Sequence, residues 1–170
     1  MLKVLKMITD VDDWKVELLF SGRIVQDGDE TVSPDEAERR FNRYIKLVEM
    51  VEGDEGQNVF QALVDSIQAD EDYGAYQATM GAAEKFPEPK YAQYLIEALP
   101  ALIKCQPDWA GNFMVSIANQ VEFGDEARIH SFNQQLRECG SGTSQAIVEF
   151  IREQERDGWL EHRVGVLAPV

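Results

Sequence analysis

Cysteine, histidine and cationic side chains are all scarce in this chain of 170 residues. It contains two cysteines, two histidines, and 16 lysines and arginines against 31 aspartates and glutamates. Cys105 and Cys139 form no CxxC pair, so no disulfide framework is indicated. His130 and His162 have no second histidine or cysteine at the spacing of metal ligands. The sequence therefore predicts neither a metal site nor a bound cofactor.

The shortage of cations leaves a formal net charge of −15. Because nucleic-acid affinity depends largely on cations that displace counterions from phosphate, we expect no nucleic-acid partner. Binding to anionic membranes is disfavoured for the same reason. No apolar run approaches the roughly 18 residues that span a bilayer, and the first residues lack the pattern of a signal peptide. We therefore expect a cytoplasmic protein.

Catalytic motifs are also absent. No GxSxG sequence that would present a serine nucleophile occurs. The stretch Gly140-Ser141-Gly142-Thr143 is similar to a phosphate-binding loop, but no lysine follows it. We interpret it as a helix stop followed by a helix cap. The sequence predicts that the protein is not an enzyme.

Helical periodicity dominates the chain from residue 34 onward, because apolar residues recur at intervals of three and four. Ser33 and Pro34 provide an N-cap and a first helical residue, and Glu36 completes a capping box. The internal Pro100 should kink or split the helix that contains it. The expected helices are 34–52, 57–69, 73–86, 90–104, 107–121, 125–139 and 143–157.

These helices predict an all-α fold. Connections of three to five residues favour layered antiparallel hairpins, either α-solenoid-like or as a compact bundle, in a single domain over 1–170. Residues 1–32 are ambiguous, since Trp14, Val16, Leu18 and Phe20 alternate as in a strand, but a helix is favoured. The segment after Gly158 is expected to be irregular and packed by its tryptophan and valines.

A run of uncompensated negative charge is the strongest functional signal. Between residues 49 and 72 there are eight carboxylates and no lysine or arginine, and two tyrosines follow. Like charge concentrated in this way costs stability, which favours a function for it, and carboxylates mixed with tyrosines suit a basic protein partner. A solvated face with the tyrosines in the core remains open. The predicted partner-binding residues are Glu49, Glu52, Asp54, Glu55, Asp65, Asp70, Glu71, Asp72, Tyr73 and Tyr76.

A second acidic stretch, residues 27–38, places oxygen atoms at the ligand positions of a calcium-binding loop. The position that requires glycine is Val32, and Pro34 stiffens the segment. We favour loop solvation and helix capping for these carboxylates. An enzyme with a metal in this loop remains an alternative that a metal titration would test.

Several motifs give the chain a family resemblance. Residues 94–100 read Tyr-Leu-Ile-Glu-Ala-Leu-Pro, Trp109 follows Pro107-Asp108, and Asn119 comes ten residues after Trp109. Over residues 33–139 this pattern resembles the all-helical immunity proteins of bacterial polymorphic toxin systems. The stretch Val115–Ala118 departs from the family pattern because it lacks a basic residue. In this comparison Trp109 and Asn119 correspond to packing and helix-end residues.

The resemblance implies a small cytoplasmic protein that binds and blocks one cognate toxin domain. The negative charge independently suits a toxin with a basic, nuclease-like cleft, because an acidic inhibitor associates quickly with such a cleft. The alternative is an acidic helical-repeat adaptor, or a nucleic-acid mimic, that binds another basic protein.

Overall fold

Helices are the only regular secondary structure in the residues that the computed structural model describes, 8–124 and 126–169. This range contains eight α-helices, one short 3₁₀ helix and no strand, which confirms the all-α prediction. The chain divides into two compact units, one ending at Pro87 and the other beginning at Glu88. Each unit is described by itself below. The single domain over 1–170 stays a prediction.

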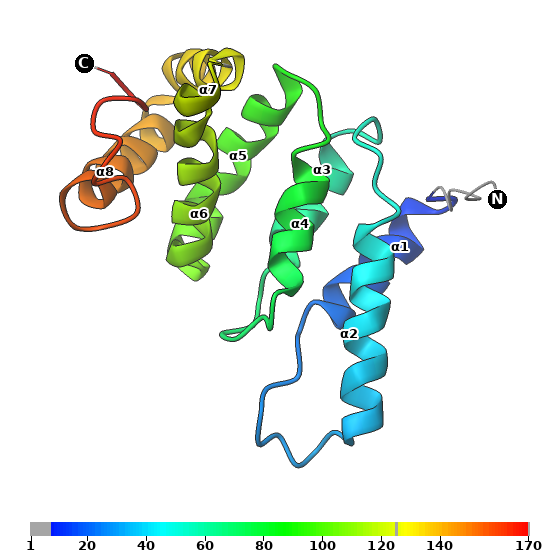
Figure 1. Cartoon of the computed structure of the whole chain (residues 1–170). Coiled ribbons are helices and arrows are strands. Elements are labelled where there is room, and N and C mark those ends of the chain that lie inside the picture. The colour runs from blue at the N-terminus through cyan, green and yellow to red at the C-terminus, as the bar shows by residue number, and fades with distance from the viewer. Residues whose placement is uncertain (1–7, 125, 170) are drawn as a thin grey trace. The chain divides into compact units, whose positions relative to one another are not determined.

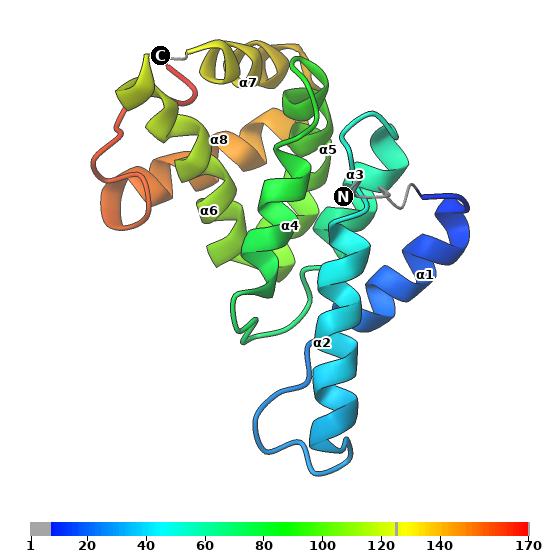
Figure 2. The ribbon, with the colours of Figure 1, turned by 45° about the vertical axis from the view of Figure 1, so that its right-hand side comes forward.

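The first unit consists of four helices, α1 (Val11–Ser21), α2 (Pro34–Val48), α3 (Gln57–Asp65) and α4 (Ala75–Ala83). Helix α1 packs against α2 and α3, while α4 packs against α2 and α3 (Figures 1 and 2). Asp10 caps α1 by accepting hydrogen bonds from two backbone amides, and the Ser33 hydroxyl accepts one from Glu36 N. The helix favoured for the N-terminal region is thus present, although residues 1–7 lie outside the described residues.

The connections in this unit are longer than the predicted three to five residues, because the helices are shorter than the periodicity indicates. They cover residues 22–33, 49–56 and 66–74. After α2 the chain turns at Gly53, whose φ is +97° and where an added Cβ would lie 2.4 Å from Lys85 O. After α3 the amides of Gln68 and Ala69 bond to the Tyr76 hydroxyl instead of continuing the helix.

Two buried tyrosines form the polar centre of the first unit. Tyr44 from α2 and Tyr76 from α4 meet edge to face with ring centroids 6.0 Å apart. The Ser66 hydroxyl donates to Leu63 O at 2.6 Å, so it accepts from the Tyr44 hydroxyl at 2.8 Å. Thr79 Oγ1 lies 2.5 Å from the same hydroxyl. These bonds join α2, α3 and α4 within an otherwise apolar core.

The Tyr76 hydroxyl holds three backbone groups from two connections. It donates to Gly22 O at 2.7 Å and accepts from Gln68 N and Ala69 N at 2.9 and 2.7 Å. Burial raises the pKa of Tyr76, which keeps the donated proton in place. The hydroxyl oxygen of Tyr76 therefore connects α4 to the residue that follows α1 and to the segment after α3.

The second unit is built around α5 (Lys90–Cys105), which packs against α6 (Pro107–Ala118), α7 (Ala127–Glu138) and α8 (Ser141–Asp157). The 3₁₀ helix η1 (Asn119–Phe123) extends α6. Helix α5 runs through Pro100 as one element, so of the two predicted effects, a kink or a split, the split does not occur. The remaining helix boundaries agree with the prediction within a few residues.

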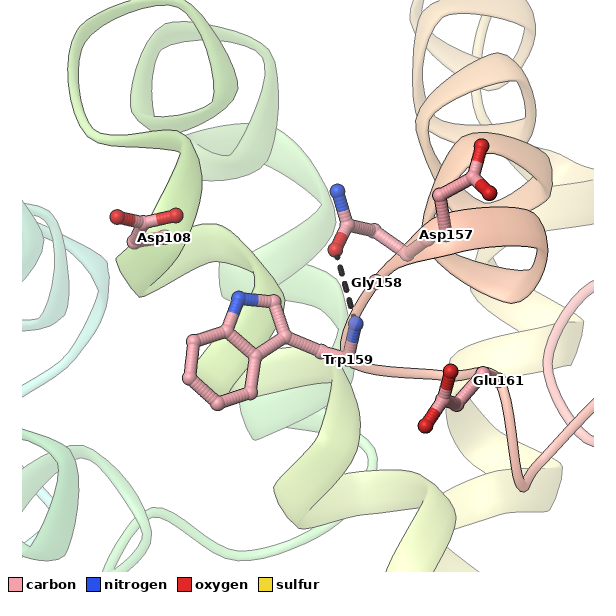
Figure 3. A pocket seen from close by; sticks show the side chains of 6 residues that line it. Asp108, Asp157, Gly158, Trp159 and Glu161 are labelled. Carbon is pink, nitrogen blue, oxygen red and sulfur yellow. Dashed lines mark hydrogen bonds between the residues drawn. The ribbon is translucent and has the colours of Figure 1, made fainter.

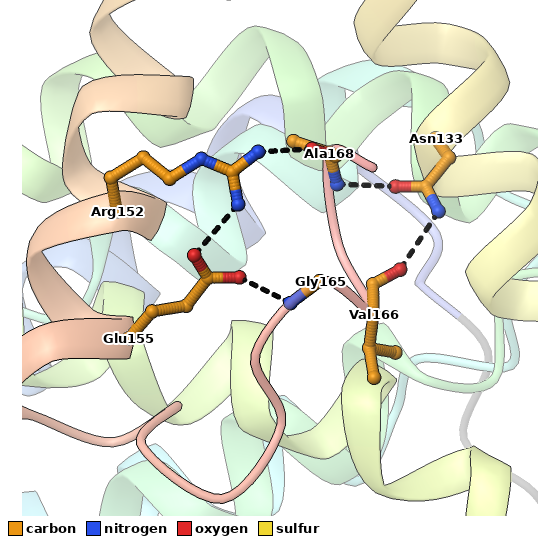
Figure 4. Close-up of polar contacts among 6 residues, drawn as sticks. All are labelled: Asn133, Arg152, Glu155, Gly165, Val166 and Ala168. Carbon is orange, nitrogen blue, oxygen red and sulfur yellow. Dashed lines mark hydrogen bonds and ion pairs between the residues drawn. The ribbon is translucent and has the colours of Figure 1, made fainter. Parts of the chain in front are cut away.

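The C-terminal segment 158–169 is irregular, as predicted, but is held differently from the expectation. Leu160 and Leu167 are its buried apolar residues, whereas Trp159 is half-exposed and Val164 is largely exposed. Polar contacts with α7 and α8 secure it, as Figure 4 shows. Asn133 bonds to the backbone of Val166 and Ala168, Glu155 accepts from Gly165 N, and Arg152 donates to Ala168 O.

Tyr76→Phe should destabilise the protein by about 2–4 kcal/mol, because one carbonyl and two amides lose their hydrogen bonds to this hydroxyl together. Urea unfolding followed by circular dichroism measures this loss. Tyr73→Phe is the matched control, since its hydroxyl accepts one bond, from Asp27 N, at an exposed position where water can replace it. Its cost should stay below about 1 kcal/mol. Equal losses in the two variants would contradict the role given to the Tyr76 hydroxyl.

Candidate functional site

The carboxylates predicted to bind a partner lie at the two ends of α3. We define the acidic surface as the exposed members of this set, which are Glu49, Glu52, Asp54, Asp65, Asp70 and Glu71. The first three belong to the connection 49–56, and the others lie at the end of α3 or in the connection 66–74. The nine residues of α3 separate the two groups by about 13 Å along its axis.

Two of the predicted carboxylates stabilise the local backbone by accepting hydrogen bonds from amides. The Glu55 carboxylate accepts hydrogen bonds from Glu52 N at 2.6 Å and Gly53 N at 2.9 Å, which closes the turn after α2. Asp72 Oδ2 accepts from Tyr76 N at 2.9 Å and so caps the first turn of α4. Both residues shape the connections that carry the acidic surface.

The two predicted tyrosines differ in position. Tyr73 is 48% exposed beside Asp70 and Glu71, and its hydroxyl accepts from Asp27 N at 3.0 Å. Tyr76 is 0% exposed and belongs to the core. Its assignment to the partner-binding set is therefore wrong, because a helical period places it on the inner face of α4, where its hydroxyl satisfies buried backbone groups.

The fold brings two cations to a stretch of sequence that has none. Lys85 Nζ donates to Val51 O at 2.6 Å, next to the first carboxylate group. Arg23 Nε donates to Gln68 Oε1 at 3.3 Å, next to the second. These residues come from distant parts of the chain, so the sequence pattern could not reveal them. They offset part of the negative charge, and the six exposed carboxylates still outnumber them.

The connection 66–74 is tied to the connection 22–33. The Gln26 side chain accepts from Glu71 N at 3.0 Å and donates to Glu71 O at 2.9 Å. Gln68 Nε2 donates to Leu19 O at 2.9 Å. Because the backbone on both sides of Asp70 is bonded, its carboxylate is presented from a fixed loop.

The other residues singled out from the sequence are the acidic stretch 27–38, the two histidines and the segment that begins at Gly140. In the stretch 27–38, hydrogen bonds from Thr31 lower the pKa of Asp29, and one from Arg40 lowers the pKa of Glu36. In the described part of the chain, no three histidine, cysteine, aspartate or glutamate side chains are arranged to hold a metal ion. His130 and His162 are exposed, and Gly140 precedes α8 as the cap residue.

Asn119 and Trp109 lie in the second unit. Asn119 ends α6, in agreement with the helix-end role implied by the resemblance, and its Oδ1 accepts from Arg163 Nε at 2.9 Å. Trp109 is half-buried in the first turn of α6. Elsewhere in this unit, Glu88 and Arg128 form a part-buried ion pair at 3.1 Å. Burial raises the pKa of Glu88, and the Arg128 guanidinium opposes the shift.

Sequence reasoning missed a depression in the second unit. Asp108 from α6, Gln154 and Asp157 from α8, and Trp159 and Glu161 from the C-terminal segment line it, with Gly158 (Figure 3). The only sequence signal was a tryptophan directly after a helix-ending glycine. Nothing in the linear pattern indicated that Asp108, fifty residues earlier, would lie nearby.

Comparison with protein-family models, curated proteins and solved structures finds no match to this chain. None of the helices in the described range combines the length and apolar character needed to cross a bilayer. The function must therefore be argued from the residues themselves.

Raising NaCl from about 20 mM to about 500 mM should raise the thermal unfolding midpoint by about 3 °C or more, because salt screens repulsion within the acidic surface. Scanning calorimetry measures this shift. The neutralised variant Glu52→Gln/Asp54→Asn/Asp70→Asn/Glu71→Gln should respond less to salt. An identical response would show that the repulsion arises elsewhere in the chain.

Proposed function

We propose that this protein is a non-enzymatic inhibitor that binds a basic protein through the acidic surface of its first unit. The observation that carries the proposal is the presentation of six exposed carboxylates, one at the end of α3 and five from connections whose backbone is held by Tyr76, Gln26 and Glu55. Because these connections are fixed before binding, little conformational entropy is lost on association.

Electrostatics supports a cationic partner. A surface with this charge accelerates encounter with a basic protein and repels acidic ones. Tyr73, half-exposed next to Asp70 and Glu71, adds an aromatic group that suits the centre of a protein interface. Binding of this kind needs no catalytic group.

The particular function we propose is immunity to a cognate bacterial toxin in the cytoplasm. The resemblance of residues 33–139 to helical immunity proteins of polymorphic toxin systems supports it. A nuclease-like toxin is the partner that fits best, because a cleft that binds nucleic acid must be basic. Covering such a cleft with carboxylates would block substrate access.

The experiment uses genetic arrangement, since an immunity gene is expected directly after its toxin gene. The C-terminal domain encoded by the upstream gene is expressed in a host bacterium, alone or with this protein. Growth should stop when the domain is expressed alone and recover with co-expression. A harmless upstream product, or arrest that this protein does not relieve, would refute the immunity function.

Asp70→Lys/Glu71→Lys should slow association with the toxin domain at least about tenfold at low ionic strength. Asp72 is left unchanged because it caps α4. Glu149→Lys/Glu153→Lys on α8 is the matched control, since both variants raise the net charge of −15 by four. Stopped-flow kinetics at several salt concentrations measures both. Equal slowing would mean that net charge, and not this surface, governs binding.

A further inference from the structure

The depression in the second unit has an aromatic centre with carboxylates around it. Its volume is about 470 Å³ and it is open to solvent. Figure 3 shows the Trp159 indole with Asp108, Asp157 and Glu161 surrounding it. The lining contains no lysine or arginine in the described residues. It is therefore a concave, negatively charged surface with a half-exposed indole among its carboxylates.

The Trp159 side chain is held in place although 48% of it is exposed. A Cβ added at Gly111 of α6 would lie 2.3 Å from Trp159 Cδ1 and 2.9 Å from Nε1, so the five-membered ring packs directly on that glycine. Trp159 N donates to Gln154 Oε1 at 3.2 Å. These contacts hold the indole in position while about half of the residue stays exposed.

The ends of two helices contribute to the electrostatic potential in the depression. Helix α8 ends at Asp157, and the carbonyls of its last turn carry partial negative charge that favours a cation. The N-terminus of α6 has the opposite polarity, but Asp108 in its first turn offsets it. His162 Nε2 lies 3.0 Å from Glu161 Oε1. A bound cation would therefore share the Glu161 carboxylate with His162 or displace the imidazole from it.

We propose that this depression binds the guanidinium group of an arginine presented by a basic protein. A guanidinium is planar, stacks on an indole face and donates to carboxylates at the same time. The volume exceeds that of a guanidinium group alone, and the opening to solvent suits a side chain delivered from the surface of another protein. The site lies in the second unit and is independent of the acidic surface of the first unit.

The test uses nuclear magnetic resonance of the Trp159 indole N–H, identified by its disappearance in Trp159→Phe. The probe is the peptide N-acetyl-Gly-Arg-Gly-amide, and the comparator replaces arginine with citrulline, which has a similar shape and no charge. The arginine peptide should shift the indole signal saturably, and the citrulline peptide should bind at least about fivefold more weakly. A lysine peptide should also bind more weakly, because an ammonium group cannot stack.

Asp157→Asn/Glu161→Gln should weaken binding of the arginine peptide at least about fivefold. Both positions are exposed, so the fold should tolerate the change. Glu149→Gln/Glu153→Gln, which removes the same charge elsewhere on α8, should leave affinity within about twofold. No saturable shift, equal binding of arginine and citrulline or lysine peptides, or equal weakening by the two variants would overturn the proposal. These outcomes leave the co-expression test unaffected, because that test concerns inhibition of a toxin by the acidic surface of the first unit.

Discussion

The first unit depends on a single buried hydroxyl. Tyr76 satisfies Gly22 O, Gln68 N and Ala69 N simultaneously, and these groups come from the end of α1 and the segment after α3. Loss of this hydroxyl would remove a hydrogen bond from all three groups at once, and leaving a buried group unsatisfied costs more than an ordinary hydrogen bond contributes. Packing against Tyr44 places the hydroxyl where all three groups converge.

This constraint links the core to the proposed binding surface. The amides that bond to Tyr76 directly precede Asp70 and Glu71, so the same interaction that ends α3 sets the position of these carboxylates. Asp72 and Glu55 shape the flanking backbone. A rigid acidic surface is electrostatically costly to the isolated protein, and complementary charge on a partner would remove that cost on binding.

The two units present negative charge in different forms. In the first unit, carboxylates project from connections between helices and produce a broad field. In the second, three carboxylates surround one indole in a depression, an arrangement suited to a single cationic side chain. A broad field chiefly raises the rate of encounter, whereas a shaped site contributes orientation and a slower dissociation.

The sequence alone determined the all-α class, the start of α2 at Pro34 and most helix positions in the second unit, because caps, prolines and apolar periodicity act over a few residues. Only the tertiary structure decided the early end of α3, since the Tyr76 hydroxyl competes there with helical carbonyls. Tertiary contacts also decided that Tyr76 is core, that Lys85 and Arg23 lie beside the acidic connections, and that Asp108 lies near Trp159. Those pairings join residues far apart in the chain, so no local pattern encodes them.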